Sequence, residues 1–358
     1  MKIVHILNEL KPSGAEVMLQ LAAPIWIAMG YELHIISMCE SRGPFAENLE
    51  SAGWKIHLSK HSTSKWKTLL AVRNEIKKLA PDRIHIHTEK LNAGFAIIAW
   101  SLGIPATRTI HSNFLYEGVI RWKKIAERWI NRKTGLQQIA ISESVKHNEN
   151  VRLKNPSKLC WNWIDSNKFR LPKEGERTQA RLKLGLPENQ KIIVSVGNGS
   201  DVKNYESIIR AIAKLQDDNL FYCQIGHTRE YDRKIANDLL VQNQVRFVGP
   251  RNDIVDWLWA ADLYIMPSHY EGFGLAAAEA LATGCKCIFS NCSGLLDFKT
   301  LGAHARWVPP TVSDIAAAIL SALMEPLTQE LANHNSALCI KHFSTESQAK
   351  AYAQIWHQ

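Results

Sequence analysis

Two successive runs of short apolar segments, alternating with helix-length segments, constrain the fold of this 358-residue chain most strongly. The first run begins with KIVHIL at residues 2–7 and continues through YELHIISM, RIHIH and ATRTIHS. The second begins with KIIVSVG at residues 191–197 and continues through LFYCQIG, VRFVG and LYIMPS. Strands separated by helices predict parallel sheets with helices on both faces. We therefore expect an α/β protein with two Rossmann-like doubly wound domains that face each other across a cleft.

A polar stretch with prolines and glycines separates the two runs and sets the expected domain boundaries. Residues 164–189 hold one helical segment and no apolar strand, which is typical of an interdomain linker. We predict an N-terminal domain at 1–163 and a C-terminal domain at 190–340. A last helix at 341–358 is expected to pack back on the N-terminal domain.

The charge and the apolar runs limit the kinds of partner and the location. The chain has 43 Lys and Arg against 34 Asp and Glu, a net charge of +9. This charge fits nucleic acid, an anionic membrane surface or phosphorylated small molecules. The longest apolar runs are strand-sized, far below the roughly 20 residues of a membrane-spanning helix. The N-terminus also lacks a secretory apolar region, so we expect a cytoplasmic protein.

Several motifs that would assign a function directly do not occur. The sequence has no G-x-x-x-x-G-K-[ST] loop, no H-E-x-x-H and no G-x-S-x-G, which argues against P-loop, zinc-peptidase and serine-hydrolase chemistry. It has no Asp-x-Asp pair either. We therefore predict that no metal ion bridges a carboxylate pair to a nucleotide diphosphate.

One predicted strand-to-helix turn, SHYEGFGLAAAEALATG at 268–284, concentrates polar and flexible residues. Gly272 and Gly274 allow the backbone to approach a ligand closely, and an alanine-rich helix follows them. The N–H groups at a helix N-terminus favour an anion. Glu271 and Glu279 would then lie at different depths around this anion site. Alternatively, Glu271 caps the helix and Glu279 faces solvent.

Lys203 occupies the equivalent turn after the strand at 191–197 and before a helix that starts near Asn204. Ligands of parallel α/β sheets bind beyond the carboxyl ends of the strands. A lysine there is placed to meet a diphosphate. The alternative is an exposed lysine in a polar turn.

These motifs together resemble the signature of the family 4 retaining glycosyltransferases, which have the GT-B fold. Glu271 and Glu279 match an E-x7-E pattern with its Gly-Phe-Gly step. PSGAE at 12–16 resembles the family's Gly-Gly-x-Glu turn, and SVGNGSDVKN at 195–204 resembles its V-G-R-x4-K-N segment. WNWIDSNKF at 161–169 resembles N-G-[VI]-D-x3-F. The resemblance spans nearly the whole chain.

The resemblance implies a role for each matched residue. Lys203 would neutralise the leaving diphosphate. Glu271 would contact hydroxyls of the donor sugar, and Glu279 would bind the ribose hydroxyls. Gly14 would let the first-domain loop close over the phosphates, while the backbone N–H groups of residues 273–275 hold the sugar and phosphates.

The sequence departs from the family pattern at Asn198, where an arginine is usual. One of the two cations expected on the diphosphate is therefore either missing or supplied from elsewhere, and Arg251 is the candidate. Trp163 stands where the family has glycine, and Ser13 replaces the first glycine of the opening loop. The predicted donor-binding residues are Gly14, Asn198, Arg251, Gly272, Phe273, Gly274, Leu275 and Glu279.

Three histidines in the first domain are candidates for function. His85 and His87 alternate along one strand and therefore share a face, which leaves two interpretations, strand packing or a metal pair. His111 follows another strand, at a position where the resembled family often has a histidine beside the donor sugar and acceptor. We predict that His111 belongs to the catalytic set with Lys203 and Glu271.

The segment RWKKIAERWINRK at 121–133 has six basic residues and one glutamate, with Trp122 and Trp129 among them. A basic-aromatic helix fits an anionic membrane or a lipid diphosphate acceptor, and it also fits nucleic acid. The simpler alternative is a solvated helix whose tryptophans face the core. Because the resembled family binds acceptors in this domain, we favour the membrane. The predicted acceptor or membrane residues are Arg121, Trp122, Lys123, Lys124 and Arg128.

The resemblance predicts a retaining hexosyltransferase of bacterial surface-polysaccharide biosynthesis (O-antigen, capsule, exopolysaccharide or lipopolysaccharide). It would move a hexose or N-acetylhexosamine from a nucleotide diphosphate sugar, a UDP-sugar rather than a GDP-sugar, to a lipid-linked glycan. We expect no cofactor, no metal requirement, no nucleic-acid partner, and a peripheral position on the inner face of the cytoplasmic membrane. The alternatives are a GT-B epimerase or phosphorylase, or a non-catalytic binder of sugar nucleotides or nucleic acid.

Overall fold

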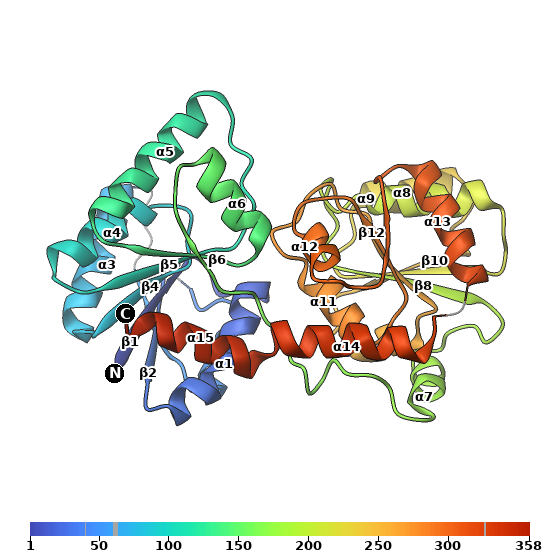
Figure 1. The fold of residues 1–358 in the computed structure, drawn as a ribbon, viewed down its shortest axis with the longest axis horizontal. Coiled ribbons are helices and arrows are strands. Elements are labelled where there is room, and N and C mark those ends of the chain that lie inside the picture. Colours follow the sequence, from blue (N-terminus) through green and yellow to red (C-terminus); the bar gives the residue numbers. More distant parts are fainter. Residues whose placement is uncertain (40, 60–63, 326) are drawn as a thin grey trace. The chain divides into compact units, whose positions relative to one another are not determined.

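The chain forms two compact units in the computed structural model (Figure 1). The structure describes residues 1–39, 41–59, 64–325 and 327–358. Unit 1 comprises residues 1–163 together with 345–358, and unit 2 comprises residues 164–344. Each unit contains one parallel sheet, which confirms the predicted pair of Rossmann-like domains.

Unit 1 contains a seven-stranded sheet in the order β3-β2-β1-β4-β5-β6-β7. Its strands are β1 (Lys2–Leu7), β2 (Glu32–Ser37), β3 (Lys55–Leu58), β4 (Arg83–Ile86), β5 (Ala106–Ile110), β6 (Gln137–Ala140) and β7 (Lys158–Leu159). Strands are added first on one side of β1 and then on the other, so the order reverses between β1 and β4. Crevices at such a reversal are the usual ligand sites of parallel sheets.

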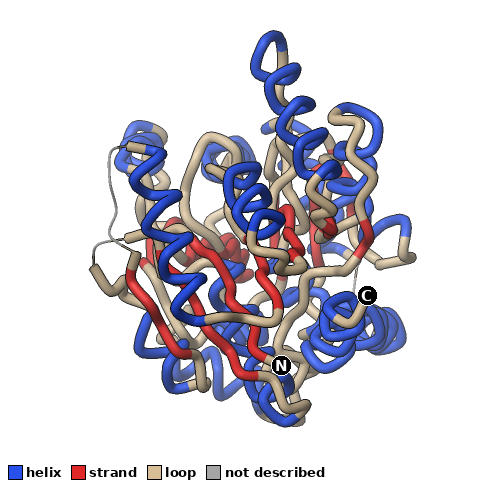
Figure 2. The backbone as a smooth tube through the Cα atoms, turned by 90° about the vertical axis from the view of Figure 1, so that its left-hand side faces the viewer, coloured by secondary structure: helices blue, strands red, loops and turns tan. Residues whose placement is uncertain are grey.

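Helices cover both faces of this sheet (Figure 2). They are α1 (Gly14–Ala28), α2 (Ala46–Ser51), α3 (Lys65–Leu79), α4 (Asn92–Ser101), α5 (Gly118–Lys133), α6 (Glu143–Arg152) and the C-terminal α15 (Thr345–Trp356). Alternation along β1 sends Val4 into a core with α3 and α4, while His5 packs against Trp26 of α1 and Trp356 of α15. The indole N–H of Trp26 donates to the carbonyl of Ala349 at 2.9 Å, which ties α15 to α1.

Unit 2 contains a six-stranded sheet in the order β10-β9-β8-β11-β12-β13. Its strands are β8 (Lys191–Val196), β9 (Leu220–Ile225), β10 (Val245–Gly249), β11 (Leu263–Met266), β12 (Cys287–Ser290) and β13 (Arg306–Val308). Its helices are α7 (Glu176–Lys183), α8 (Tyr205–Leu215), α9 (Glu230–Asp238), α10 (Ile254–Ala260), α11 (Leu275–Ala282), α12 (Leu295–Thr300), α13 (Val312–Met324) and α14 (Gln329–Phe343). The strand order reverses between β8 and β11.

The stretch at 164–189, expected as a linker, lies within unit 2. Arg181 of α7 binds the carboxylate of Asp262 at 2.5 Å, and its Nε donates to the carbonyl of Ala260 at 3.0 Å. Ile164 donates its N–H to the carbonyl of Phe343 at 2.8 Å, so the two ends of unit 2 are hydrogen-bonded to each other.

Across the ranges described above, no helix is long and apolar enough to cross a membrane.

Trp163 explains one departure from the family pattern. Its side chain is buried, and its indole N–H donates to the carbonyl of Met18 at 3.0 Å. The ring also packs edge-on against Trp26 and Tyr352. A glycine at this position would leave the space between α1 and α15 unfilled.

Candidate functional site

Lys203 and Glu271 meet where the strand order of unit 2 reverses. Lys203 follows β8 and Glu271 follows β11, and these strands are neighbours. The Lys203 Nζ lies 2.7 Å from Oε1 of Glu271, and the Ser268 hydroxyl donates to the same oxygen at 2.8 Å. Both side chains are partly exposed. The structure therefore brings together the two residues predicted to meet the phosphates and the sugar.

Backbone constraints hold both side chains in place. The N–H of Glu271 donates to the carbonyl of Ser293 at 3.1 Å. Gly294 has φ +85°, and a Cβ there would lie 2.5 Å from the Glu271 carbonyl oxygen, so this approach requires glycine. Gly197 has φ +143°, and a Cβ there would lie 2.8 Å from the Tyr205 hydroxyl. The turns at the ends of β8 and β12 thus depend on glycine.

The Gly-Phe-Gly step places backbone, not the aromatic ring, at the start of α11. Phe273 is buried and packs against Phe298 and Phe343, with ring centroids 5.2 and 5.0 Å away. Gly274 caps α11 with φ +90°, and Leu275 is the first residue of the helix. The first N–H groups of a helix have no partner within it. Gly274 and Leu275 therefore lie at the start of α11, where the backbone contact with phosphate was expected, and that contact of residues 273–275 stays a prediction.

Glu279 lies one turn into α11 and is half-buried. Burial raises the pKa of its carboxyl to about 8, although Lys168 opposes the shift. Within the described part of the chain, its carboxyl has no hydrogen-bond partner. A half-buried carboxyl that is largely protonated at neutral pH differs from a solvated helix face, and it suits hydroxyl groups better than a second anion.

The residue predicted to replace the missing arginine is held elsewhere. Arg251 follows β10, which β9 separates from β8. Its guanidinium is exposed and binds Asp253 at 2.5 and 2.9 Å. The Asn198 side chain instead accepts the His227 N–H at 3.1 Å, which joins the β8 and β9 turns. Arg251 is therefore paired within its own loop, and its service to the β8 turn stays a prediction.

Arg229 is a cation near the β8 turn that the sequence reasoning did not consider. It follows β9, the strand next to β8, and a Cβ on Gly199 would lie 3.2 Å from Arg229 Cγ. Its guanidinium binds the carboxylates of Asp201 and Asp232, the latter at 2.6 Å. The available signal was position alone, an arginine shortly after the end of a strand.

His111 lies in unit 1 directly after β5, and its Nε2 is 2.9 Å from Nδ1 of His87. Burial and then Arg108 lower the pKa of His111 to about 4, so the ring is neutral at physiological pH.

Gly14 begins α1 at the same carboxyl edge of the sheet, which is the edge where β1 and β5 end.

The alternative of a metal site at His85 and His87 has a close geometric match. Nitrogen atoms of His5, His85 and His87 lie within 4.8 Å of one another. However, His85 Nε2 is hydrogen-bonded to the Thr109 hydroxyl at 2.8 Å, and its Nδ1 accepts the Trp356 N–H at 3.0 Å. Because both nitrogens of His85 are engaged, the structure favours packing.

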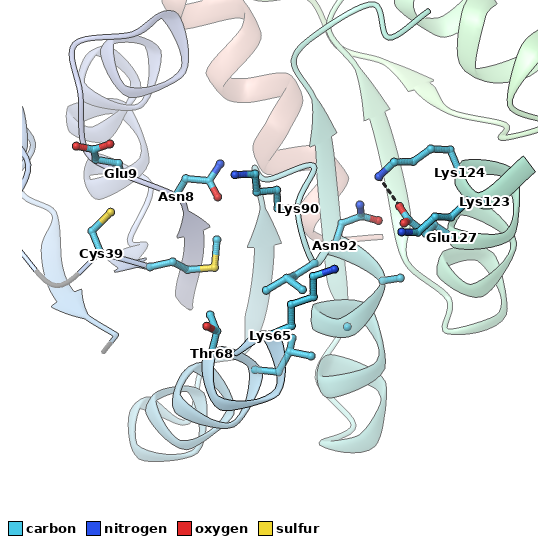
Figure 3. Close-up of a pocket in the computed structure, with 15 residues that line it drawn as sticks. Asn8, Glu9, Cys39, Lys65, Thr68, Lys90, Asn92, Lys123, Lys124 and Glu127 are labelled. Carbon is cyan, nitrogen blue, oxygen red and sulfur yellow. Dashed lines mark hydrogen bonds and ion pairs between the residues drawn. The ribbon is translucent and has the colours of Figure 1, made fainter. Parts of the chain in front are cut away.

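A cavity of about 760 Å³ opens at the carboxyl edge of the unit 1 sheet, where the strand order reverses (Figure 3). This volume suits a small ligand. Its lining combines the apolar side chains of Met38, Leu69 and Leu91 with the amines of Lys65, Lys90 and Lys123. No motif in the sequence indicated the cavity, because its residues come from five separate segments.

Helix α5 differs from the prediction in which side chains it exposes. Arg128 is fully buried between Glu89 and Glu149, at 2.7 and 2.9 Å, so it cannot face an acceptor or a membrane. Lys124 is also mostly buried and pairs with Glu89 and Glu127. Arg121 donates to the carbonyl of Arg152 at 3.1 Å. Of the predicted set, Trp122 and Lys123 are exposed.

Two family models match this chain, one in each half of the sequence. Residues 12–158 match the model Glycosyltransferase Family 4, and residues 176–337 match Glycosyl transferases group 1. An N-acetyl-alpha-D-glucosaminyl L-malate synthase of Bacillus anthracis is 27% identical over 170 residues, 45% of this chain and 44% of the relative. A UDP-Gal:alpha-D-GlcNAc-diphosphoundecaprenol alpha-1,3-galactosyltransferase of Escherichia coli is 28% identical over 253 residues, 64% of this chain and 62% of the relative. The chain spans about half the length of the curated relatives it matches.

Solved structures show the same fold over the whole chain. A glycosyltransferase from Rickettsia africae ESF-5 has a TM-score of 0.86 at 16% identity, covering 99% of this chain and 97% of that one. Anabaena Alr3699/HepE in complex with UDP and glucose has a TM-score of 0.85 at 19% identity, covering 100% of both chains. Two parallel-sheet domains with these likenesses define the GT-B class of glycosyltransferases. Within that class, the chain belongs to the family 4 glycosyltransferases, which confirms the resemblance seen in the sequence.

Proposed function

We propose that the protein transfers a hexose or N-acetylhexosamine from a UDP-sugar to a hydroxyl of a glycan acceptor, with retention at the anomeric carbon. The observation that carries the proposal is the Lys203–Glu271 pair, 2.7 Å apart, beside the N-terminus of α11. The Anabaena neighbour whose structure contains UDP and glucose supports a uridine donor over a guanosine donor. The Escherichia coli relative, by its name, uses UDP-Gal and a diphosphoundecaprenol-linked acceptor, which supports a lipid-linked glycan of surface polysaccharide.

The chemistry follows from where charge develops. As the bond to the sugar breaks, negative charge builds on the leaving phosphate, and Lys203 with the first N–H groups of α11 would stabilise it. Glu271, adjacent to Lys203, would hold sugar hydroxyls. Because a side-chain cation neutralises the phosphate, we propose that no metal is required. The leaving phosphate would accept the acceptor's proton, so no separate general base is needed.

The direct test is a donor panel followed by product analysis. We expect UDP-sugars, more than GDP-sugars, to raise the unfolding temperature, because a ligand that binds the native state stabilises it by mass action. With a lipid-linked glycan and EDTA present, NMR should show a product with the anomeric configuration of the donor. Donor conversion without any acceptor would indicate an epimerase instead. Salt-sensitive DNA binding without donor consumption would contradict the proposal.

We also propose that the enzyme works on a membrane surface. Helix α5 supports this because its charged side chains point into unit 1 while apolar side chains are exposed. Its inward face carries the charged Arg121, Lys124 and Arg128. Its outward face carries Val119 and Trp122, which are 85% and 69% exposed. Apolar side chains normally face the core, so such an outward face indicates an apolar environment outside the protein.

The neighbouring helices extend this surface. Four of the twelve tryptophans are exposed, and they all lie on α3, α4 and α5: Trp66, Trp100, Trp122 and Trp129. Within these three helices, which the structure describes completely, every exposed charge is basic: Lys65, Lys67, Lys77, Lys78, Lys123, Arg132 and Lys133. Tryptophan suits the interface of a bilayer, and lysine suits anionic headgroups. This combination favours an anionic lipid surface over another protein.

For the double substitution Trp122→Ser and Trp129→Ser, we expect at least tenfold weaker binding to vesicles that contain anionic lipid, because the apolar contact is lost. Sedimentation with vesicles measures the partition, and added salt should weaken it. A variant with Leu240→Ser and Met324→Ser, two exposed apolar residues of unit 2, is the matched control. Equal binding of all three proteins would contradict the proposal.

A further inference from the structure

Three histidines form a hydrogen-bonded chain through the sheet of unit 1. His5 Nδ1 lies 2.9 Å from His87 Nε2, and His87 Nδ1 lies 2.9 Å from His111 Nε2. Burial lowers the pKa of all three rings, so each is neutral near pH 7. A neutral imidazole has one N–H donor and one acceptor nitrogen. The N–H groups of this histidine chain can therefore all donate toward His5 or all donate toward His111. Once the tautomer of the histidine at one end is known, the tautomers of the other two histidines follow.

The buried end of the chain fixes the direction. His5 Nε2 is buried without a hydrogen-bond partner, among the indole rings of Trp26, Trp54 and Trp356. The indole N–H groups donate elsewhere: to the carbonyls of Ala349 (Trp26, 2.9 Å) and Leu19 (Trp54, 3.1 Å), and to Nδ1 of His85 (Trp356, 3.0 Å). None of them is left to donate to His5 Nε2.

An N–H group suits this position better than a lone pair. The face of an aromatic ring is electron-rich and attracts N–H groups. The rings of His5 and Trp54 form an edge-to-face pair, with 4.8 Å between centroids and 74° between planes, so His5 Nε2 is buried next to aromatic rings and has no polar partner among the residues that the structure describes. We therefore assign the proton of His5 to Nε2, which leaves Nδ1 as an acceptor.

The remaining tautomers follow in sequence. His5 Nδ1 must accept an N–H from His87 Nε2, and so His87 Nδ1 accepts an N–H from His111 Nε2. The ring of His111 then carries its lone pair on Nδ1. We infer that His87 and His5 are positioning residues that hold His111 as the Nε2–H tautomer, so that His111 accepts a hydrogen bond from a substrate hydroxyl.

This assignment narrows what His111 recognises, and it rests on the proposed function for the identity of the substrate. A neutral ring that presents a lone pair repels phosphate and carboxylate oxygens, and it accepts the O–H of a sugar. His111 would therefore bind a hydroxyl of the donor sugar or of the acceptor glycan, while phosphate binding is left to Lys203. The opposite tautomer would present an N–H and suit the anion.

The tautomers can be measured without an assay of activity. In the full-length protein labelled with ¹⁵N-histidine, long-range ¹H–¹⁵N spectra at pH 7.5 distinguish Nδ1–H from Nε2–H rings. We expect His5, His87 and His111 all to carry the proton on Nε2. Nδ1–H at His111 would overturn the inference. If the tautomers are as expected and no sugar is transferred, the proposed function fails and the assignment stands.

Substitution of the middle residue tests the coupling. His87→Phe should give His111 a mixture of tautomers and lower kcat about tenfold with the KM for the donor unchanged. His87→Gln, which can both donate and accept, should restore both properties. His57→Phe is the matched control, because His57 forms the same kind of 2.9 Å pair with His34. The hydrogen bonds that link His5, His87 and His111 do not include His57. If His87→Phe leaves the tautomer and kcat of His111 unchanged, the inference is wrong.

Discussion

Replacement of Lys203 by alanine should lower kcat for sugar transfer by about 100- to 1000-fold, the usual loss when one charge-stabilising group of an active site is removed. The reason is the position of the amine. It lies at the reversal of strand order in unit 2 and beside the N-terminus of α11, where a diphosphate would bind. Charge on the leaving group is greatest in the transition state, so the loss should appear mainly in kcat.

Steady-state kinetics with a UDP-sugar would measure this effect, and two further variants would interpret it. Lys203→Arg keeps the positive charge and should recover part of the rate. Lys214→Ala removes a lysine from the other end of α8, where it is bonded to the Ser313 hydroxyl at 2.9 Å, and should keep full activity. A Lys203→Ala enzyme within threefold of wild type would exclude Lys203 from the chemistry, provided that its unfolding temperature is unchanged.

The turn at 268–284 and Lys203 could be predicted from the sequence because the residues that indicate them are close together in the chain. Strand, turn, glycine and helix follow one another within 17 residues at 268–284, and a parallel sheet places the ends of its strands at one edge. The same logic placed Lys203 at that edge. Nothing local revealed that Lys203 and Glu271 share one ion pair, because this depends on β8 and β11 being neighbours. Arg229 was not considered for the same reason, since β9 lies on the other side of β8.

The two faces of α5 show a different limit of sequence reasoning. The pattern at 121–133 predicted a basic helix with aromatics, and the structure has a helix there. Burial of Arg128 depends on Glu89 and Glu149, which come from the β4–α4 loop and from α6. Periodicity alone cannot show which of two faces has such partners, because cations and aromatics both recur at helical spacing.

The hydrogen-bonded chain of His5, His87 and His111 could not be predicted from the sequence for a similar reason. Alternation put His85 and His87 on one face of β4, but the links to His5 and His111 depend on which strands are adjacent. The order β1-β4-β5 provides this adjacency. The three indoles that fix the tautomer come from residues 26, 54 and 356, far apart in the sequence.

Replacement of Arg128 by methionine should lower the free energy of unfolding of unit 1 by about 3–5 kcal/mol at pH 7, as expected when one partner of a buried ion pair is removed. The guanidinium is fully buried and hydrogen-bonded to the carboxylates of Glu89 and Glu149. Methionine fills a similar volume, so the loss reflects charge rather than a cavity. Urea unfolding followed by tryptophan fluorescence would measure it. Lys133→Met, an exposed substitution on the same helix, should stay within about 0.5 kcal/mol.

The pH dependence of that loss distinguishes charge from packing. Burial raises the pKa of Glu89, but Arg108, Arg128 and Lys124 outweigh burial and lower it from 4.5 to about 2. A carboxylate whose pKa is lowered in the folded state stabilises the fold above pH 4.5, and that stabilisation disappears as the pH falls through 2. In Arg128→Met the pKa of Glu89 should rise, since one of the cations that lower it is gone. The difference between wild type and variant should therefore be largest near pH 7 and narrow between pH 4.5 and 2. A difference that is constant over this range would mean that the side chain of Arg128 acts by packing alone.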